Sequence, residues 1–189
     1  MKLRLALPKL DAVDELPGGE DACLVLTSFA DDRPLRGLTG LCDWRLNGQL
    51  SRLLQRDFID GHYQDAMLVP IRGRLPFGRL MLVGLGKRSD FNAQRFEEVC
   101  RFCFTKLLAM GTSSFAMALP GRVGLDVGVR QALVGWRRAV TESFPVETLA
   151  DLDIWLLESA EAQRELVEPM RNLERELNEL AARHKSAQA

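Results

Sequence analysis

Histidine, cysteine and tyrosine are scarce in this chain of 189 residues, which has two histidines, four cysteines and one tyrosine. A structural zinc site needs four cysteine or histidine ligands that converge, and the Cys100-x-x-Cys103 pair has no second pair to join it. Disulfide frameworks are typical of small secreted chains. We therefore expect no metal site, no cofactor and no disulfide. Free cysteines are usually buried, so the four thiols are predicted to be reduced and buried: Cys23, Cys42, Cys100 and Cys103.

Long hydrophobic runs and a strong net charge are also missing. No apolar run approaches the roughly 18–20 residues that span a bilayer, and the opening segment breaks at Pro8 without the apolar core of a secretory signal. We therefore expect a cytoplasmic protein without a membrane segment. The 25 basic residues oppose 26 acidic ones, a net charge of −1, which does not favour nucleic acid as a partner.

The polar residues that carry chemistry form no catalytic constellation. Nucleophilic catalysis needs a base beside serine or cysteine, and His62 stands in a turn-like Gly61-His62-Tyr63 segment that is typical of a surface histidine. His184 belongs to the end of the chain and is expected to be solvated. We predict no catalytic residue and interpret two acidic groups as solvated loop acids: Asp11, Asp14 and Glu15, then Asp31 and Asp32.

The hydrophobic periodicity alternates between strand-like and helix-like segments. Strands are predicted at residues 3–7, 22–29, 66–71, 79–84, 114–119 and 149–157, with a hairpin joining the third and fourth. Helices are predicted at residues 46–54, from the Asn92 cap to Gly111, and from Asp126 through Val140. This alternation predicts an α/β domain with a mixed, mostly parallel sheet.

The composition changes at Glu158, which predicts a domain at residues 1–157 and a helical tail at residues 158–189. Pro169 is expected to interrupt the tail or to begin a new helix. Beyond it, apolar residues are spaced three, four and three apart, as in an a/d seam. The seam either docks on its own domain or mediates self-association, and its residues are Met170, Leu173, Leu177 and Leu180.

Three stretches resemble the N-terminal domain of the leucyl (cytosol) aminopeptidase family. They are Asp21–Leu26, Leu41–Leu54 and Arg79–Lys87, the last ending in Val83-Gly84-Leu85-Gly86-Lys87. The resemblance covers about residues 20–145. It implies a macro-domain-like three-layer α/β sandwich.

The same resemblance implies what the chain does not carry. In that family the two zinc ions belong to a separate C-terminal domain, whose Asn-Thr-Asp-Ala-Glu-Gly-Arg-Leu signature does not occur here. We therefore expect a non-catalytic interaction or regulatory domain. Its expected partner is a second copy of itself or another protein, such as a catalytic aminopeptidase chain.

A second hypothesis is a small-ligand site at the turn that follows the strand at residues 79–84. Ligands gather at the carboxyl ends of strands in open α/β sheets, and amides at a helix start attract phosphate. The residues are Gly84, Gly86 and Lys87, with a nucleotide or an ADP-ribose-like molecule as the ligand. The alternative is a tight turn in which glycine meets a backbone requirement.

Basic residues gather near that turn and on a later helix. Their spacing would allow a local basic face, but no motif that reads DNA accompanies them. Solvated arginines are the preferred interpretation of Arg72, Arg74, Arg79, Lys87 and Arg88, and of the Arg137-Arg138 pair.

Overall fold

The computed structural model describes residues 1–71, 73–122 and 127–188, the last of these by its backbone alone. Its centre is a six-stranded sheet in the order β1-β6-β5-β2-β4-β3. Every neighbouring pair is parallel except β3 and β4, which are antiparallel. The predicted mixed sheet and its hairpin are confirmed, and the first strand lies at one edge. The strands are β1 (Lys2–Ala6), β2 (Gly19–Ser28), β3 (Ala66–Val69), β4 (Phe77–Gly84), β5 (Ser114–Met117) and β6 (Asp153–Leu157).

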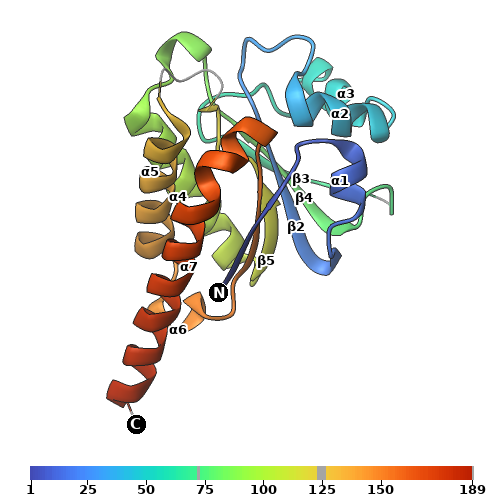
Figure 1. Ribbon diagram of the computed structural model, residues 1–189. Helices are drawn as coiled ribbons and strands as arrows, with labels where there is room; N and C mark the ends of the chain where they lie inside the picture. Colours follow the sequence, from blue (N-terminus) through green and yellow to red (C-terminus); the bar gives the residue numbers. More distant parts are fainter. Residues whose placement is uncertain (72, 123–126, 189) are drawn as a thin grey trace.

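Helices cover both faces of the sheet, so the predicted three layers are confirmed (Figure 1). Alternate residues of β2 explain the arrangement, because Cys23 and Val25 join one core while Leu24 and Leu26 join the other. The first core lies under α4 (Ala93–Ala109), α5 (Val129–Ser143) and α7 (Ala160–Gln188). The second lies under α1 (Leu10–Asp14), α2 (Gly37–Arg45) and α3 (Gln49–Gln55).

The long helix α4 forms where its sequence predicts it. Asn92 caps the first turn by accepting a hydrogen bond from the backbone N–H of Arg95 at 3.0 Å. Gly111 ends the helix with φ +65°. Cys100 and Cys103 lie on its buried face, and all four cysteines are free and buried as predicted. Burial raises the pKa of Cys23, Cys42 and Cys103 to about 12.

Several predicted boundaries are wrong. The helix expected at residues 46–54 begins only at Gln49, as α3, because Asn47 and Gly48 adopt positive φ before it; α2 at residues 37–45 was not predicted. Leu149 belongs to the short helix α6 (Val146–Leu149) rather than to the strand that follows it. Residues 10–14 form α1 rather than a loop. Asp126, the expected start of α5, lies outside the described residues.

The tail is one uninterrupted helix. Pro169 stands inside α7, although proline removes one helical hydrogen bond and crowds the preceding turn. Leu166, Met170 and Leu173 pack into the first core on both sides of this position, and that packing holds the helix together across the proline. From Ala162 to Ala181, the helix therefore shares a core with the rest of the chain.

Candidate functional site

A cavity of about 470 Å³ opens at the carboxyl ends of β2 and β5. These two strands are neighbours, but the chain leaves β2 toward α2 on one face of the sheet and leaves β5 toward α5 on the other. Such a point, where the connections diverge, is where open α/β sheets form their ligand crevices. The fold therefore builds a recess here.

Four separate segments line the cavity. β2 and the loop after it contribute an apolar floor that includes Leu26 and Phe29, and the segment after β5 contributes Ala118 and Leu119. The first turn of α2 forms another wall, and the segment after β4 contributes Leu85. Charged side chains complete the lining: Asp32, Arg36, Arg88 and Arg122.

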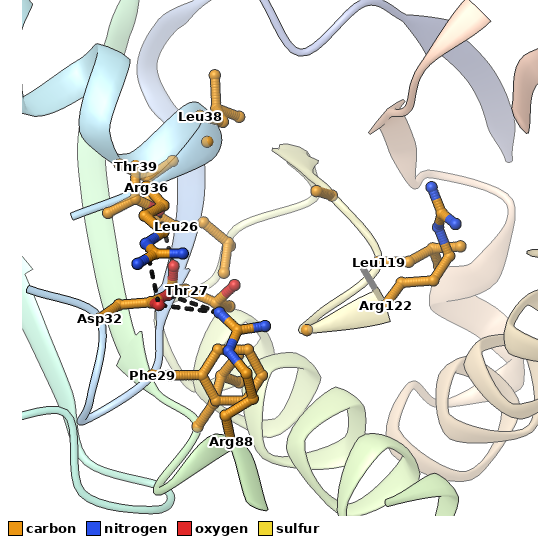
Figure 2. A pocket seen from close by; sticks show the side chains of 15 residues that line it. Leu26, Thr27, Phe29, Asp32, Arg36, Leu38, Thr39, Arg88, Leu119 and Arg122 are labelled. Carbon is orange, nitrogen blue, oxygen red and sulfur yellow. Dashed lines mark hydrogen bonds and ion pairs between the residues drawn. The ribbon is translucent and has the colours of Figure 1, made fainter. Parts of the chain in front are cut away.

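Asp32 is the centre of the charged wall (Figure 2). Arg88 donates from Nη2 to both carboxylate oxygens of Asp32, at 2.9 and 3.1 Å. The Nε of Arg36 lies 3.8 Å from the same carboxylate. Asp32 is only 8% exposed, so the prediction of a solvated loop acid is wrong for this residue. Its buried charge is compensated by Arg88, which is distant in the sequence but adjacent in the fold.

Arg88 is held on a second side by an aromatic ring. Its guanidinium carbon lies 4.2 Å from the ring centroid of Phe29, which is within the range of a cation–π contact. Phe29 in turn meets Phe91 edge-on, with ring centroids 5.2 Å apart. These contacts fix the position of Arg88 beside the cavity, so its charge is part of a rigid wall.

Arg122 lies on the other side of the cavity from Asp32 (Figure 2). It donates to Glu158 from Nε at 3.0 Å and from Nη2 at 2.7 Å. The other oxygen of Glu158 accepts the backbone N–H of Leu119 at 3.0 Å. Counted together, three arginines and two carboxylates leave this region with a formal charge of +1.

The helix that follows Arg36 adds to the positive potential. Gly37, Leu38 and Thr39 form its first turn and line the cavity. Within this described turn, no side chain caps the helix at Arg36. The positive end of the α2 dipole therefore faces the recess. The first turn of α2 thus adds its positive potential to that of Arg36 and Arg88.

The three predicted ligand residues lie next to the cavity but do not line it. A Cβ on Gly84 would lie 2.0 Å from the backbone oxygen of His62, and Gly86 has φ +74° with Tyr63 beside it. The glycines therefore meet a packing requirement. Lys87 is exposed to solvent. Their chain neighbours, Leu85 and Arg88, do line the cavity.

The segment that packs on these glycines is itself fixed. Tyr63 donates a hydrogen bond to Glu98, and Arg95 lies over its ring at 4.8 Å. Burial, together with the bond to Glu98, raises the pKa of Tyr63. His62, as predicted, is an exposed residue that contacts Asp60.

The seam of the tail is occupied within the chain. Met170, Leu173 and Leu177 are at most 3% exposed and belong to the first core, whereas Leu180 is 42% exposed. The tail helix therefore docks on its own domain, which is the first of the two predicted alternatives. In the folded chain, three of the four seam residues offer no free surface for self-association.

The basic residues do not form one face. Arg79 lies near the start of β4 and donates to the backbone oxygen of Met110 at 2.9 Å, at the end of the sheet away from Lys87. Arg137 pairs with Glu176, and Arg138 pairs with Glu97. Arg72 lies outside the described residues. Arg137 and Arg138 are more than half exposed, as expected of solvated arginines, whereas Arg79 is partly buried by its contacts.

Two absences hold for residues 1–71, 73–122 and 127–188. None of their helices is long and apolar enough to cross a membrane. Within the same part of the chain, no group of three or more histidine, cysteine, aspartate or glutamate side chains has the arrangement to hold a metal ion.

Comparison with known proteins identifies relatives of this fold. Residues 25–138 match the model of the cytosol aminopeptidase family, N-terminal domain. A probable cytosol aminopeptidase of Geobacter sp. is 31% identical over 112 residues, covering 59% of this chain and 22% of the relative. One of Halorhodospira halophila is 28% identical over 134 residues, covering 71% and 26%. The chain thus spans about a quarter of the length of these curated relatives.

A solved structure shows the same fold. A tomato leucine aminopeptidase mutant superimposes with a TM-score of 0.53 at 18% sequence identity. The match covers 87% of this chain and 35% of that one.

Proposed function

Because the chain belongs to the cytosol aminopeptidase family, of which it matches the N-terminal domain, we propose that it is a non-catalytic accessory domain that binds a small anionic ligand. The cytoplasm is the compartment that we propose for it, because its relatives are probable cytosol aminopeptidases. Its role is to report the presence of the ligand to an aminopeptidase rather than to cleave peptides itself.

One observation carries the ligand-binding proposal: the cavity at the switch point of the sheet has a positive wall. Its volume of about 470 Å³ falls in the usual range of small-molecule sites, about 300–1,000 Å³. Its lining combines an apolar floor with a few placed charges, as such sites do. Arg36 and the first turn of α2 supply donors for an anion.

The test is a panel of small carboxylates and phosphates at millimolar concentration, with binding followed by ligand-observed NMR. Leu38→Trp places a bulky ring in the cavity wall, whereas Leu41→Trp adds the same ring one turn along α2 at a position that is already 40% exposed. We expect binding to be lost in the first variant and kept in the second. No binder in the panel, or equal binding by both variants, would contradict the proposal.

A second candidate function is contact with an aminopeptidase catalytic region, favoured by exposed aromatic side chains on the α2–α3 layer. Trp44 is 74% exposed and Phe58 is 63% exposed. Aromatic side chains of this kind dominate the energetics of protein interfaces. The matched part of the relatives is about a quarter of their length, so a catalytic region is the partner that we propose.

Co-purification with a full-length aminopeptidase of the family tests this contact. We expect Trp44→Ala to reduce the recovered complex, whereas Val134→Ala serves as the control because Val134 is 60% exposed on α5, in the opposite layer. Recovery that is the same for both variants, or no complex with the unmodified chain, would refute it.

A further inference from the structure

Asp32 and Arg36 place opposite charges side by side at one wall of the cavity (Figure 2). Their closest atoms are 3.8 Å apart, which is too long for a hydrogen bond. The side chain of Arg36 is 70% exposed, whereas that of Asp32 is 12% exposed. A ligand that enters the cavity therefore meets a mobile cation beside a fixed carboxylate.

Both groups keep unused bonding capacity. Among the described residues, Asp32 is the ion-pair partner of Arg36, and none accepts a hydrogen bond from the Arg36 guanidinium. Asp32 receives its two side-chain hydrogen bonds from one nitrogen of Arg88. A carboxylate has about four lone-pair sites, so acceptor positions remain for a donor on the ligand.

We propose that the cavity binds a free α-amino acid with an apolar side chain. Its carboxylate binds Arg36 and the first turn of α2, and its ammonium group donates to Asp32. Its side chain lies on the apolar floor formed by Leu26, Phe29 and Leu119. This inference rests on the proposed ligand-binding function and names the class of ligand.

Charge and spacing favour this class over others. A phosphate dianion at Arg36 would lie against the buried carboxylate of Asp32, and like charges this close are repulsive. A peptide carries its ammonium and carboxylate groups on different residues, whereas a free amino acid carries both on one carbon. The paired wall matches the second arrangement.

Calorimetric titration of the full chain tests the proposal with L-leucine as the probe. Leucinamide lacks the carboxylate, 4-methylpentanoate lacks the ammonium group, and leucyl-leucine separates the two. AMP and inorganic phosphate represent the phosphate class. We expect leucine to bind and each of the other compounds to bind at least about tenfold more weakly, since a charged hydrogen bond contributes about 1.5–3 kcal/mol.

Three variants locate the site. Arg36→Gln and Asp32→Asn are each expected to weaken leucine binding at least about tenfold, whereas Arg56→Gln, an exposed arginine beyond α3 and outside the cavity, should bind as the unmodified chain does. Circular dichroism checks folding. If Asp32→Asn fails to fold, Arg36→Gln still decides the outcome, because its side chain is mostly exposed.

The possible failures are distinguishable. If AMP or phosphate binds more tightly than leucine and Leu38→Trp abolishes that binding, the amino-acid inference is wrong and the proposed anion-binding function stands. If leucine binds but Arg36→Gln leaves its affinity unchanged, the inference is also wrong. If neither these probes nor the wider panel binds, both the inference and the proposed function fail.

Discussion

The carboxylate of Glu158 accepts two hydrogen bonds from the guanidinium of Arg122, at 3.0 and 2.7 Å. Glu158 follows the last residue of β6, and Arg122 follows the turn beyond β5. Because Glu158 also accepts the backbone N–H of Leu119, this pair joins one side of the cavity to the start of α7.

Removal of one partner should therefore be costly. Glu158 is 4% exposed, and the side chain of Arg122 is 19% exposed. Glu158→Ala leaves a mostly buried guanidinium uncompensated, and we expect the free energy of unfolding to fall by about 2–3 kcal/mol. Urea denaturation measures it. Glu165→Ala is the matched control, since its carboxylate meets Arg130 at 3.8 Å on the exposed surface and should contribute less than about 1 kcal/mol. Equal losses in the two variants would contradict this role.

The seam of α7 should act as core rather than as an oligomer interface. Leu173→Ala removes a side chain that is 3% exposed, and we expect a loss of about 2–5 kcal/mol. Leu180→Ala, at a position 42% exposed, should cost much less. Truncation after Glu168 removes Met170, Leu173 and Leu177 from the core, so we expect it to unfold the chain. A folded truncated chain whose mass in light scattering falls would instead support self-association through the tail.

Gly84 should not tolerate a side chain. A Cβ there would lie 2.0 Å from the backbone oxygen of His62, which must then shift together with the segment that packs beside β4. We expect Gly84→Ala to lower the free energy of unfolding by about 2–4 kcal/mol. Gly128→Ala provides the comparison, because the Cβ built on Gly128 meets nothing within 4 Å and its φ is −61°. Similar thermal midpoints for both variants would show that the turn can adjust.

The buried thiols should make the chain sensitive to alkaline pH. Burial raises the pKa of Cys23, Cys42 and Cys103 from 9.0 to about 12. The unfolded chain loses these protons at lower pH than the folded chain does, so the stabilisation is complete below pH 9 and declines as the pH rises toward 12. Urea midpoints measured from pH 7 to pH 11 should fall accordingly.

The same burial predicts slow chemistry at the thiols. An aromatic disulfide reagent should react with the four cysteines of the native chain only as fast as the chain opens, because thiolates are the reactive species. In urea all four should react within minutes. Rapid labelling of the folded chain at pH 8 would contradict the burial of these residues.

Local signals in the sequence predict much of this fold, and long-range contacts explain what they miss. The Asn92 cap, the apolar run of β2 and the hairpin of β3 and β4 depend on neighbours in the chain, and each was predicted correctly. Helix α2 was missed, because Gly37 and Gly40 weaken its helical pattern. Packing of Cys42 and the bond from Thr39 to the backbone oxygen of Thr27 hold it in place.

The candidate site was predicted only in part. The sequence indicated the correct edge of the sheet, since the Gly84–Lys87 turn adjoins the cavity. It did not reveal the pairing of Asp32 with Arg88, because these residues come from different connections and meet only when β2 and β4 align. A prediction that β2 and β4 pair in parallel would have indicated that the loops after these strands lie side by side.

Helix α7 ties the wall of the cavity to the far end of the core. Its 29 residues extend about 43 Å at 1.5 Å per residue, and its first turn follows Glu158 directly. Apolar residues seat α7 in the first core along most of this length, from Ala162 to Ala181. The helix therefore holds the Glu158 anchor beside the cavity and the far end of the core in one rigid unit.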